Sequence, residues 1–250
     1  MKSNFLKETL YRLLAAFFWI LVWWVAALIV GNGYFLPSPV DTVLALFSLL
    51  SEAEFYTVVL FSILRVLCGL GLGVAVGSLL AAASHHLPFV RRLVCPVISV
   101  FKAMPVATFI IILWITLRGS LLSIFIGFMM VMPIIFQNLL DGYDSIDKTL
   151  LEVTRAYEFS AFKRFRLLTL PTLLAFFAPA LITSIGLAFK SQIAAEIIAY
   201  TNESIGQYIF DSKYNGQHDK VFAWALVIVT VSILLEYLTK KLLWRFKNES

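Results

Sequence analysis

Long apolar stretches alternate with short polar connectors along the chain. The apolar stretches lie at about residues 13–30, 58–83, 94–117, 121–140, 172–197 and 221–243. Since ~20 helical residues cross the ~30 Å core of a bilayer, each stretch is about long enough to span a membrane. The pattern predicts an all-α, polytopic membrane protein with six transmembrane helices. Pro105 should break the third helix, and Pro133 should kink the fourth.

The first apolar stretch could also belong to a cleaved signal peptide. The apolar core of a signal peptide is shorter, ~7–15 residues, and a cleavage site of small residues follows it. Here the residues from Gly31 to Phe35 form no such site. We therefore expect an uncleaved membrane span.

The connectors differ in composition. Residues 31–39 are rich in turn formers, and residues 41–56 form an amphipathic segment without Lys or Arg, which we expect along the outer surface. Residues 118–120 predict a tight outer turn, and residues 202–220 a polar outer connector. Adjacent His85 and His86 do not share a helix face and have no third ligand nearby, so the pair favours a solvated loop over a metal site.

Small residues recur every four positions in the second apolar stretch, at Gly69, Gly73, Gly77 and Ala81. Such a stripe lets two helix backbones approach closely. It therefore predicts a helix-packing surface rather than a ligand site.

A polar, basic segment interrupts the second half of the chain at residues 152–171. Ser160 can cap a short helix beginning at Ala161, and Pro171 suits the first turn of the following helix. The segment predicts two short helices joined by a turn at residues 158–160.

Positive charge is distributed unequally between the two sides of the six-helix topology. One side holds both termini and the loops near His85 and residues 141–171, and it carries fourteen Lys and Arg residues: Lys2, Lys7, Arg12, Arg91, Arg92, Lys148, Arg155, Lys163, Arg164, Arg166, Lys240, Lys241, Arg245 and Lys247. The other side has three, Arg118, Lys213 and Lys220. By the positive-inside rule, both termini and the basic segment should be cytoplasmic.

Composition supports a membrane protein, with 60% hydrophobic and 14% charged residues. The net charge of +5 is explained by this topology rather than by nucleic-acid binding. Cys68 and Cys95 lack metal-ligand spacing, so we expect two packing residues and no metal site. No G-x-x-x-x-G-K-[ST], G-x-S-x-G or H-E-x-x-H pattern occurs, so we expect no ATPase site and no hydrolase chemistry in this chain.

Ionisable residues within the apolar stretches are the candidates for a translocation pathway. Placing a charged side chain within a membrane span is unfavourable in free energy, so such residues should face protein, water or the membrane interface. Arg65 and Glu196 lie near the outer ends of their stretches, where structural anchoring is the favoured interpretation. Lys102 and Lys190 would suit an anionic substrate, although lysines also extend toward the membrane surface. We take Lys102, Met104, Lys190 and Gln192 as pathway candidates.

The basic segment resembles the EAA loop of permease subunits from bacterial ABC importers. Glu152, Leu170 and Pro171 match the family pattern at full spacing, with Val153 and Thr154 in place of two alanines and Glu158 in place of glycine. The resemblance extends from Leu36 to about Tyr237, through LPSP, SILRVLCGLGLGVAVG, Met104-Pro105 and AAEII in the family's order. It is closest to the nitrate/sulfonate/taurine-type branch.

The resemblance implies a type I ABC importer permease fold in the bacterial inner membrane. It also implies a homodimer, two cytoplasmic ATPase subunits that bind the ATP, and an extracytoplasmic solute-binding protein. Six unduplicated helices independently favour a dimer, because a central pathway needs a second wall. The expected ATPase-coupling residues are Glu152, Arg155, Ala156, Glu158 and Phe159.

We expect three regions: residues 1–57 with the first span and outer segment, a permease core at 58–243, and a cytoplasmic tail at 244–250. The coupling loop lies at about 141–171. The favoured function is transport of a small anion, which could be a sulfonate, nitrate or a vitamin precursor. A membrane-embedded enzyme and a stand-alone secondary transporter stay open as alternatives.

Overall fold

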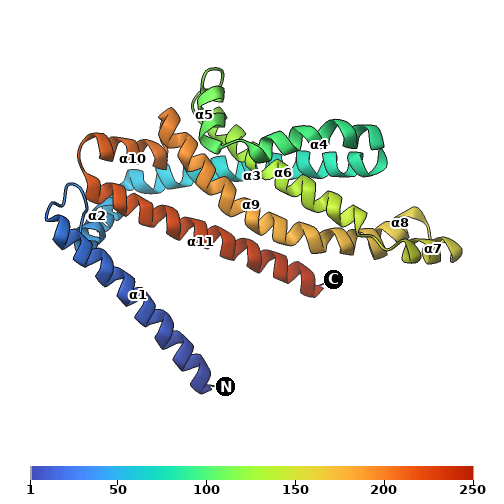
Figure 1. The fold of residues 1–250 in the computed structure, drawn as a ribbon, viewed down its shortest axis with the longest axis horizontal. Helices are drawn as coiled ribbons and strands as arrows, with labels where there is room; N and C mark the ends of the chain where they lie inside the picture. Colours follow the sequence, from blue (N-terminus) through green and yellow to red (C-terminus); the bar gives the residue numbers. More distant parts are fainter. Residues whose placement is uncertain (1, 250) are drawn as a thin grey trace. The chain divides into compact units, whose positions relative to one another are not determined.

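The computed structural model describes the backbone of residues 2–249 and the side chains of residues 8–244. All secondary-structure elements within residues 2–249 are helices. The elements in chain order are α1 (Lys2–Val30), α2 (Pro39–Ser51), α3 (Ala53–His86), α4 (Pro88–Ala103), α5 (Val106–Trp114), α6 (Ser120–Asp144), α7 (Lys148–Ala156), α8 (Ala161–Arg164), the π-helical η1 (Phe165–Thr169), α9 (Leu170–Ala199), α10 (Ile205–Tyr214) and α11 (His218–Glu249) (Figure 1). The all-α prediction is therefore confirmed.

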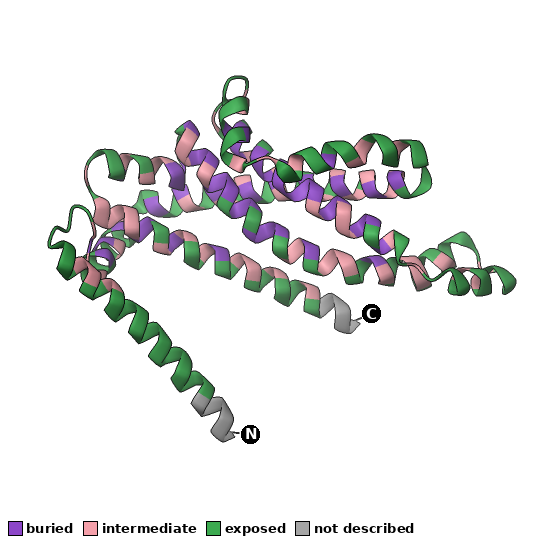
Figure 2. Ribbon diagram, viewed as in Figure 1, coloured by how far each residue is buried: buried purple, intermediate pink, exposed green. Residues whose placement is uncertain are grey.

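The chain forms two compact units. One comprises Met1–Val58 with Tyr208–Val229, and the other comprises Val59–Gln207 with Thr230–Ser250. In the first unit, α1 has no buried residue between Glu8 and Val30, and most of this stretch is exposed (Figure 2). This exposure suits a helix that contacts lipid.

Aromatic contacts hold the first unit together. The rings of Phe55 and Trp224 stack with centroids 5.3 Å apart, and Trp224 is fully buried. The Tyr208 hydroxyl donates a 2.7 Å hydrogen bond to Glu54 Oε2. This bond raises the pKa of Tyr208 to about 12, so the phenol stays neutral and keeps its role as donor.

In the second unit, α6 and α9 form an extensive helix pair. Both helices carry many buried residues (Figure 2). The glycine stripe of α3 packs against α6, because added Cβ atoms would lie 2.7 Å from Ile124 O at Gly69, 2.6 Å from Val131 Cβ at Gly73 and 2.8 Å from Met132 O at Gly77. The predicted role of the stripe in close helix packing is confirmed.

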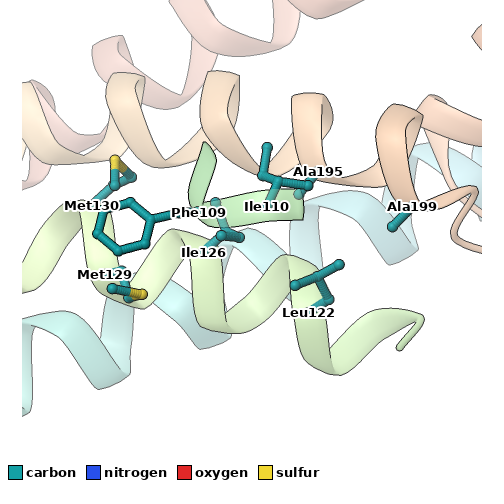
Figure 3. Packing of buried hydrophobic residues seen from close by; sticks show 8 residues of the cluster. All are labelled: Phe109, Ile110, Leu122, Ile126, Met129, Met130, Ala195 and Ala199. Carbon is teal, nitrogen blue, oxygen red and sulfur yellow. The ribbon is translucent and has the colours of Figure 1, made fainter. Parts of the chain in front are cut away.

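A hydrophobic cluster joins the short helix α5 to α6 and α9 (Figure 3). Phe109 and Ile110 of α5 meet Ile126 of α6 and Ala195 of α9, and all four are buried. The cluster fixes α5 to the helix pair.

Five helices of the described part are long and apolar enough to cross a membrane. The third predicted span is different: α4 and α5 meet at a bend of 102° at Met104-Pro105, and the count reaches six only if this pair is one span. Pro105 disfavours helical geometry in the preceding residue, and Met104 is accordingly extended, with ψ of 135°. The predicted break at Pro105 is thus confirmed, and the stretch 94–117 is divided between two helices.

Three other segments show helices or helix ends that the sequence did not specify. The outer segment 41–56 is divided at Glu52 between α2 and α3, because Ser38 and Asp41 start α2 with a capping box and Glu52 leaves helical geometry. The His85–His86 pair ends α3 instead of lying in a loop, and His85 stacks on Tyr143 with ring centroids 4.5 Å apart. The polar connector 202–220 contains α10.

Candidate functional site

The coupling segment predicted at residues 141–171 contains two short helices, as expected. Asp147 caps α7 by accepting a 2.7 Å hydrogen bond from Thr149 N, and Ser160 caps α8 by accepting from Lys163 N at 3.3 Å. Neither helix has a buried residue. The side chains of α7 and α8 are therefore accessible to solvent or to a partner protein.

The turn between the two helices is a Schellman motif centred on Glu158. Phe159 N donates to Thr154 O and Glu158 N donates to Arg155 O, both at 2.9 Å. This geometry places Glu158 in the left-handed region, with φ of +52°. Glycine adopts that region without strain. The left-handed backbone conformation thus explains why the EAA pattern has glycine at this position. Glu158 adopts the same conformation, but with an unfavourable conformational energy.

The five coupling candidates lie close together around this turn. Glu152, Arg155, Ala156 and Glu158 are exposed, and Phe159 is half-buried, with Lys163 Nζ 4.1 Å from its ring centroid. Ala156 is one helical turn after Glu152, so both lie on the same face of α7. The face offers a carboxylate beside a small residue.

Pro171 lies in the first turn of α9, as expected, and α9 continues directly from α8 and η1. Residues Ala161–Ala199 form one helix of 39 residues that contains η1. At the end of η1, Leu170 N bonds Phe165 O, five residues back. This wider pairing just before Pro171 is compatible with the missing N–H of proline.

A buried polar cluster lies near the other end of this helix. Glu196 is fully buried, and its carboxylate accepts from Arg65 Nη1 at 3.3 Å and from Ser62 Oγ at 2.9 Å. Arg65 also donates to the backbone oxygens of Asn202 at 3.1 Å and Glu203 at 3.0 Å. The anchoring interpretation of Arg65 and Glu196 is confirmed, and the structure adds that each anchors the other.

The four pathway candidates occupy different environments. Lys102 and Lys190 are exposed, and Met104 packs at the edge of the cluster around Phe109. Gln192 is fully buried, and its Nε2 donates to Arg65 O at 3.0 Å. Its Oε1 has no hydrogen-bond partner among the described residues. Their roles in translocation stay predictions.

Sequence reasoning missed a fifth intramembrane charge, Glu236. This half-buried residue of α11 packs on α9, since a Cβ added at Gly186 would meet Glu236 Oε1. The signal was present in the sequence, because Glu236 interrupts the apolar run of the sixth span.

Residues 73–247 match the family described as the binding-protein-dependent transport system inner membrane component. The chain belongs to this family. It is therefore a multi-pass permease of a binding-protein-dependent transport system, as the resemblance predicted.

A relative identified by sequence similarity agrees with this assignment. The chain is 26% identical over 238 residues to SsuC of Bacillus subtilis (strain 168), which is named as an aliphatic sulfonates transport permease, and the match covers 92% of this chain and 86% of SsuC.

Two solved transporters share the fold. One is an amino acid ABC transporter, with a TM-score of 0.63, 13% identity, and coverage of 79% of this chain and 94% of that one. The other is the inward-facing MetNI methionine ABC transporter, with a TM-score of 0.59, 16% identity, and coverage of 76% and 93%. The predicted type I ABC importer permease fold is thus confirmed.

Proposed function

We propose that this permease moves a small organic anion, and that aliphatic sulfonates are the first substrates to test. The name of its relative SsuC supports that class. The exposed Lys102 and Lys190 are available to attract an anion along the pathway. Met104 and Gln192 are the neutral residues we assign to the same pathway.

The observation that carries the mechanism is the continuity between the coupling segment and the fifth span. An exposed, capped α7 precedes a 39-residue helix that runs from Ala161 to Ala199. At 1.5 Å per residue this helix is about 58 Å long. Movement imposed on α7 by a closing ATPase would therefore act directly on the helix that forms the fifth span.

The proposed assembly is a homodimer with two cytoplasmic ATPase subunits and an extracytoplasmic solute-binding protein. No G-x-x-x-x-G-K-[ST] motif occurs in the chain, so we assign ATP binding to the partner subunits and no cofactor to this chain. Membrane lipid surrounds the dimer, and nucleic acid has no role.

We place both termini and the coupling segment in the cytoplasm of a bacterial cell, on the basis of the charge distribution. Reporter enzymes fused after Ser250 or inserted near Asp147 should be active in the cytoplasm, and one inserted near Tyr214 should be active outside. An external reporter at Ser250 would contradict this orientation.

Coupling is tested by Ala156→Arg. The variant adds bulk and charge to the exposed face of α7, and burying that charge against an ATPase should cost a few kcal/mol. We expect normal membrane insertion but loss of ATPase co-purification or of substrate-stimulated ATP hydrolysis.

His86→Arg is the matched control, because it adds the same charge at another exposed position on the same expected side. It should leave co-purification unchanged. Equal behaviour of the two variants would remove α7 from the ATPase contact.

A further inference from the structure

Two adjoining hollows lie beside the turns that follow α5 and α9, within the second unit. The larger, about 630 Å³, is lined by Arg118, Ser120, Tyr200, Thr201 and Asn202 together with Trp114. The smaller, about 380 Å³, is lined by Ile111 and Ile115 together with the same Trp114 and Arg118. The larger hollow is therefore lined mainly by polar residues and the smaller one mainly by apolar residues, and both are lined by the indole of Trp114 and the guanidinium of Arg118.

Two polar residues that line the larger hollow have groups without a partner among the described residues. Arg118 is exposed and forms no ion pair with any residue whose side chain is described. Thr201 is only 1% exposed, and its Oγ1 has no hydrogen-bond partner in the described part of the chain. Buried hydroxyls are nearly always hydrogen-bonded, so this one calls for an explanation.

The polar wall of the hollow is held rigidly. Arg65 Nε donates to Ser120 Oγ at 2.9 Å, while its two other nitrogens hold the carbonyls of Asn202 and Glu203. The half-buried guanidinium of Arg65 thus ties both turns together. Tyr200 and Glu203 have positive φ values of 49° and 51°. Strained residues of this kind persist where the surroundings determine the backbone, and they concentrate at ligand sites.

We propose that these hollows form a binding site for a small organic anion with an apolar tail. Arg118 would pair with the oxyanion, Thr201 would donate its free hydroxyl proton to it, and Trp114 would cover the alkyl portion against Ile111 and Ile115. A guanidinium recognises such oxyanions through charge-assisted hydrogen bonds. The proposed site rests on the proposed import of organic anions. Both hollows lie on the predicted outer side of the membrane, so this site would bind the solute before it enters the pathway.

The test uses the full-length chain in phosphatidylcholine nanodiscs with 2-bromoethanesulfonate, whose bromine quenches a tryptophan that it touches. Saturable quenching is expected, and Trp114→Phe should remove it, although five other tryptophans stay in place. Neutral 2-bromoethanol should quench weakly. Equal saturable quenching by the alcohol, no quenching, or unchanged quenching in Trp114→Phe would overturn the site.

Variants of the polar wall test the recognition of charge. Loss of one charge-assisted contact should weaken binding about tenfold or more in Arg118→Gln. Thr201→Val, which keeps the shape of the side chain, should weaken it about threefold or more. Lys213→Gln is the control, because Lys213 is exposed on the same predicted side and lies outside both hollows. Equal affinities of Arg118→Gln and Lys213→Gln would refute the assignment.

Two further measurements separate the alternatives. Loss of quenching in nanodiscs with phosphatidylglycerol would assign the hollow to anionic lipid headgroups and overturn the proposal. ATP-driven uptake of ethanesulfonate by the assembled transporter tests the proposed function instead. Uptake with no effect of Arg118→Gln on binding would refute the site alone, and binding without uptake would refute the proposed substrate class alone.

Discussion

Glu158→Gly should stabilise the coupling turn, although glycine usually weakens helical segments. Glu158 sits at φ of +52° in the Schellman turn after α7. An L-residue in that region costs ~1–2 kcal/mol, and the greater freedom of glycine in the unfolded chain offsets ~0.5–1 kcal/mol. Its side chain forms no hydrogen bond or ion pair with the described residues, so no contact is lost. The net gain should be about 0.5–1 kcal/mol.

Glu152→Gly is the matched control, because it makes the same chemical change inside α7. Glycine there should cost ~0.5–1 kcal/mol. Hydrogen exchange of peptides covering residues 148–160 measures both variants in the nanodisc-embedded chain. Since 1 kcal/mol corresponds to about a fivefold change in an opening equilibrium, Glu158→Gly should slow exchange by up to about that factor and Glu152→Gly should accelerate it. Acceleration in both variants would refute the argument from backbone geometry.

Two further predictions concern packing and buried charge. Gly73→Ala should destabilise the purified chain by ~1–3 kcal/mol, because its Cβ would lie 2.6 Å from Val131 Cβ, whereas Gly71→Ala, with nothing within 4 Å, should be neutral or stabilising. Thermal unfolding in detergent measures both, and equal losses would count against the close contact of α3 with α6. Arg65→Met should cost ~3–5 kcal/mol by leaving the Glu196 carboxylate buried without its cation, and adding Glu196→Leu should recover part of that loss. A double variant no more stable than Arg65→Met would show that the ion pair is not the main contribution of Arg65.

Local patterns were enough for much of the fold. The apolar stretches located every long helix, because a helix must cover ~30 Å of hydrocarbon with apolar side chains. Ser160 was recognised as a cap since the rule involves only the following three residues. The glycine stripe of α3 was equally visible, because close backbone packing requires small residues at a regular spacing. These features depend on residues that are neighbours in sequence.

Features set by distant residues were not predictable. Arg65 and Glu196 are 131 residues apart, so their individual anchoring roles were inferred but not their pairing. Pro105 predicted a break, yet the 102° bend at that break depends on how α5 packs on α6 and α9. Pro171 lies in the first turn of α9 as predicted, but the π-helical turn that joins α9 to α8 was not predicted, since it has no recognised sequence signal. Tertiary packing determined each of these outcomes.

Strained or costly features occur at both ends of the helix Ala161–Ala199. Glu158, three residues before its start, has a positive φ, and so does Tyr200, directly after its end. Near that end, the buried Glu196 is held by Arg65. Such features persist only where the surrounding contacts determine them. Because the Arg65–Glu196 pair holds that end of the helix, η1, with its wider hydrogen bonding, is the place in this helix where bending costs least. Movement of the coupling segment should therefore bend the helix at Phe165–Thr169 and leave the Arg65–Glu196 pair intact.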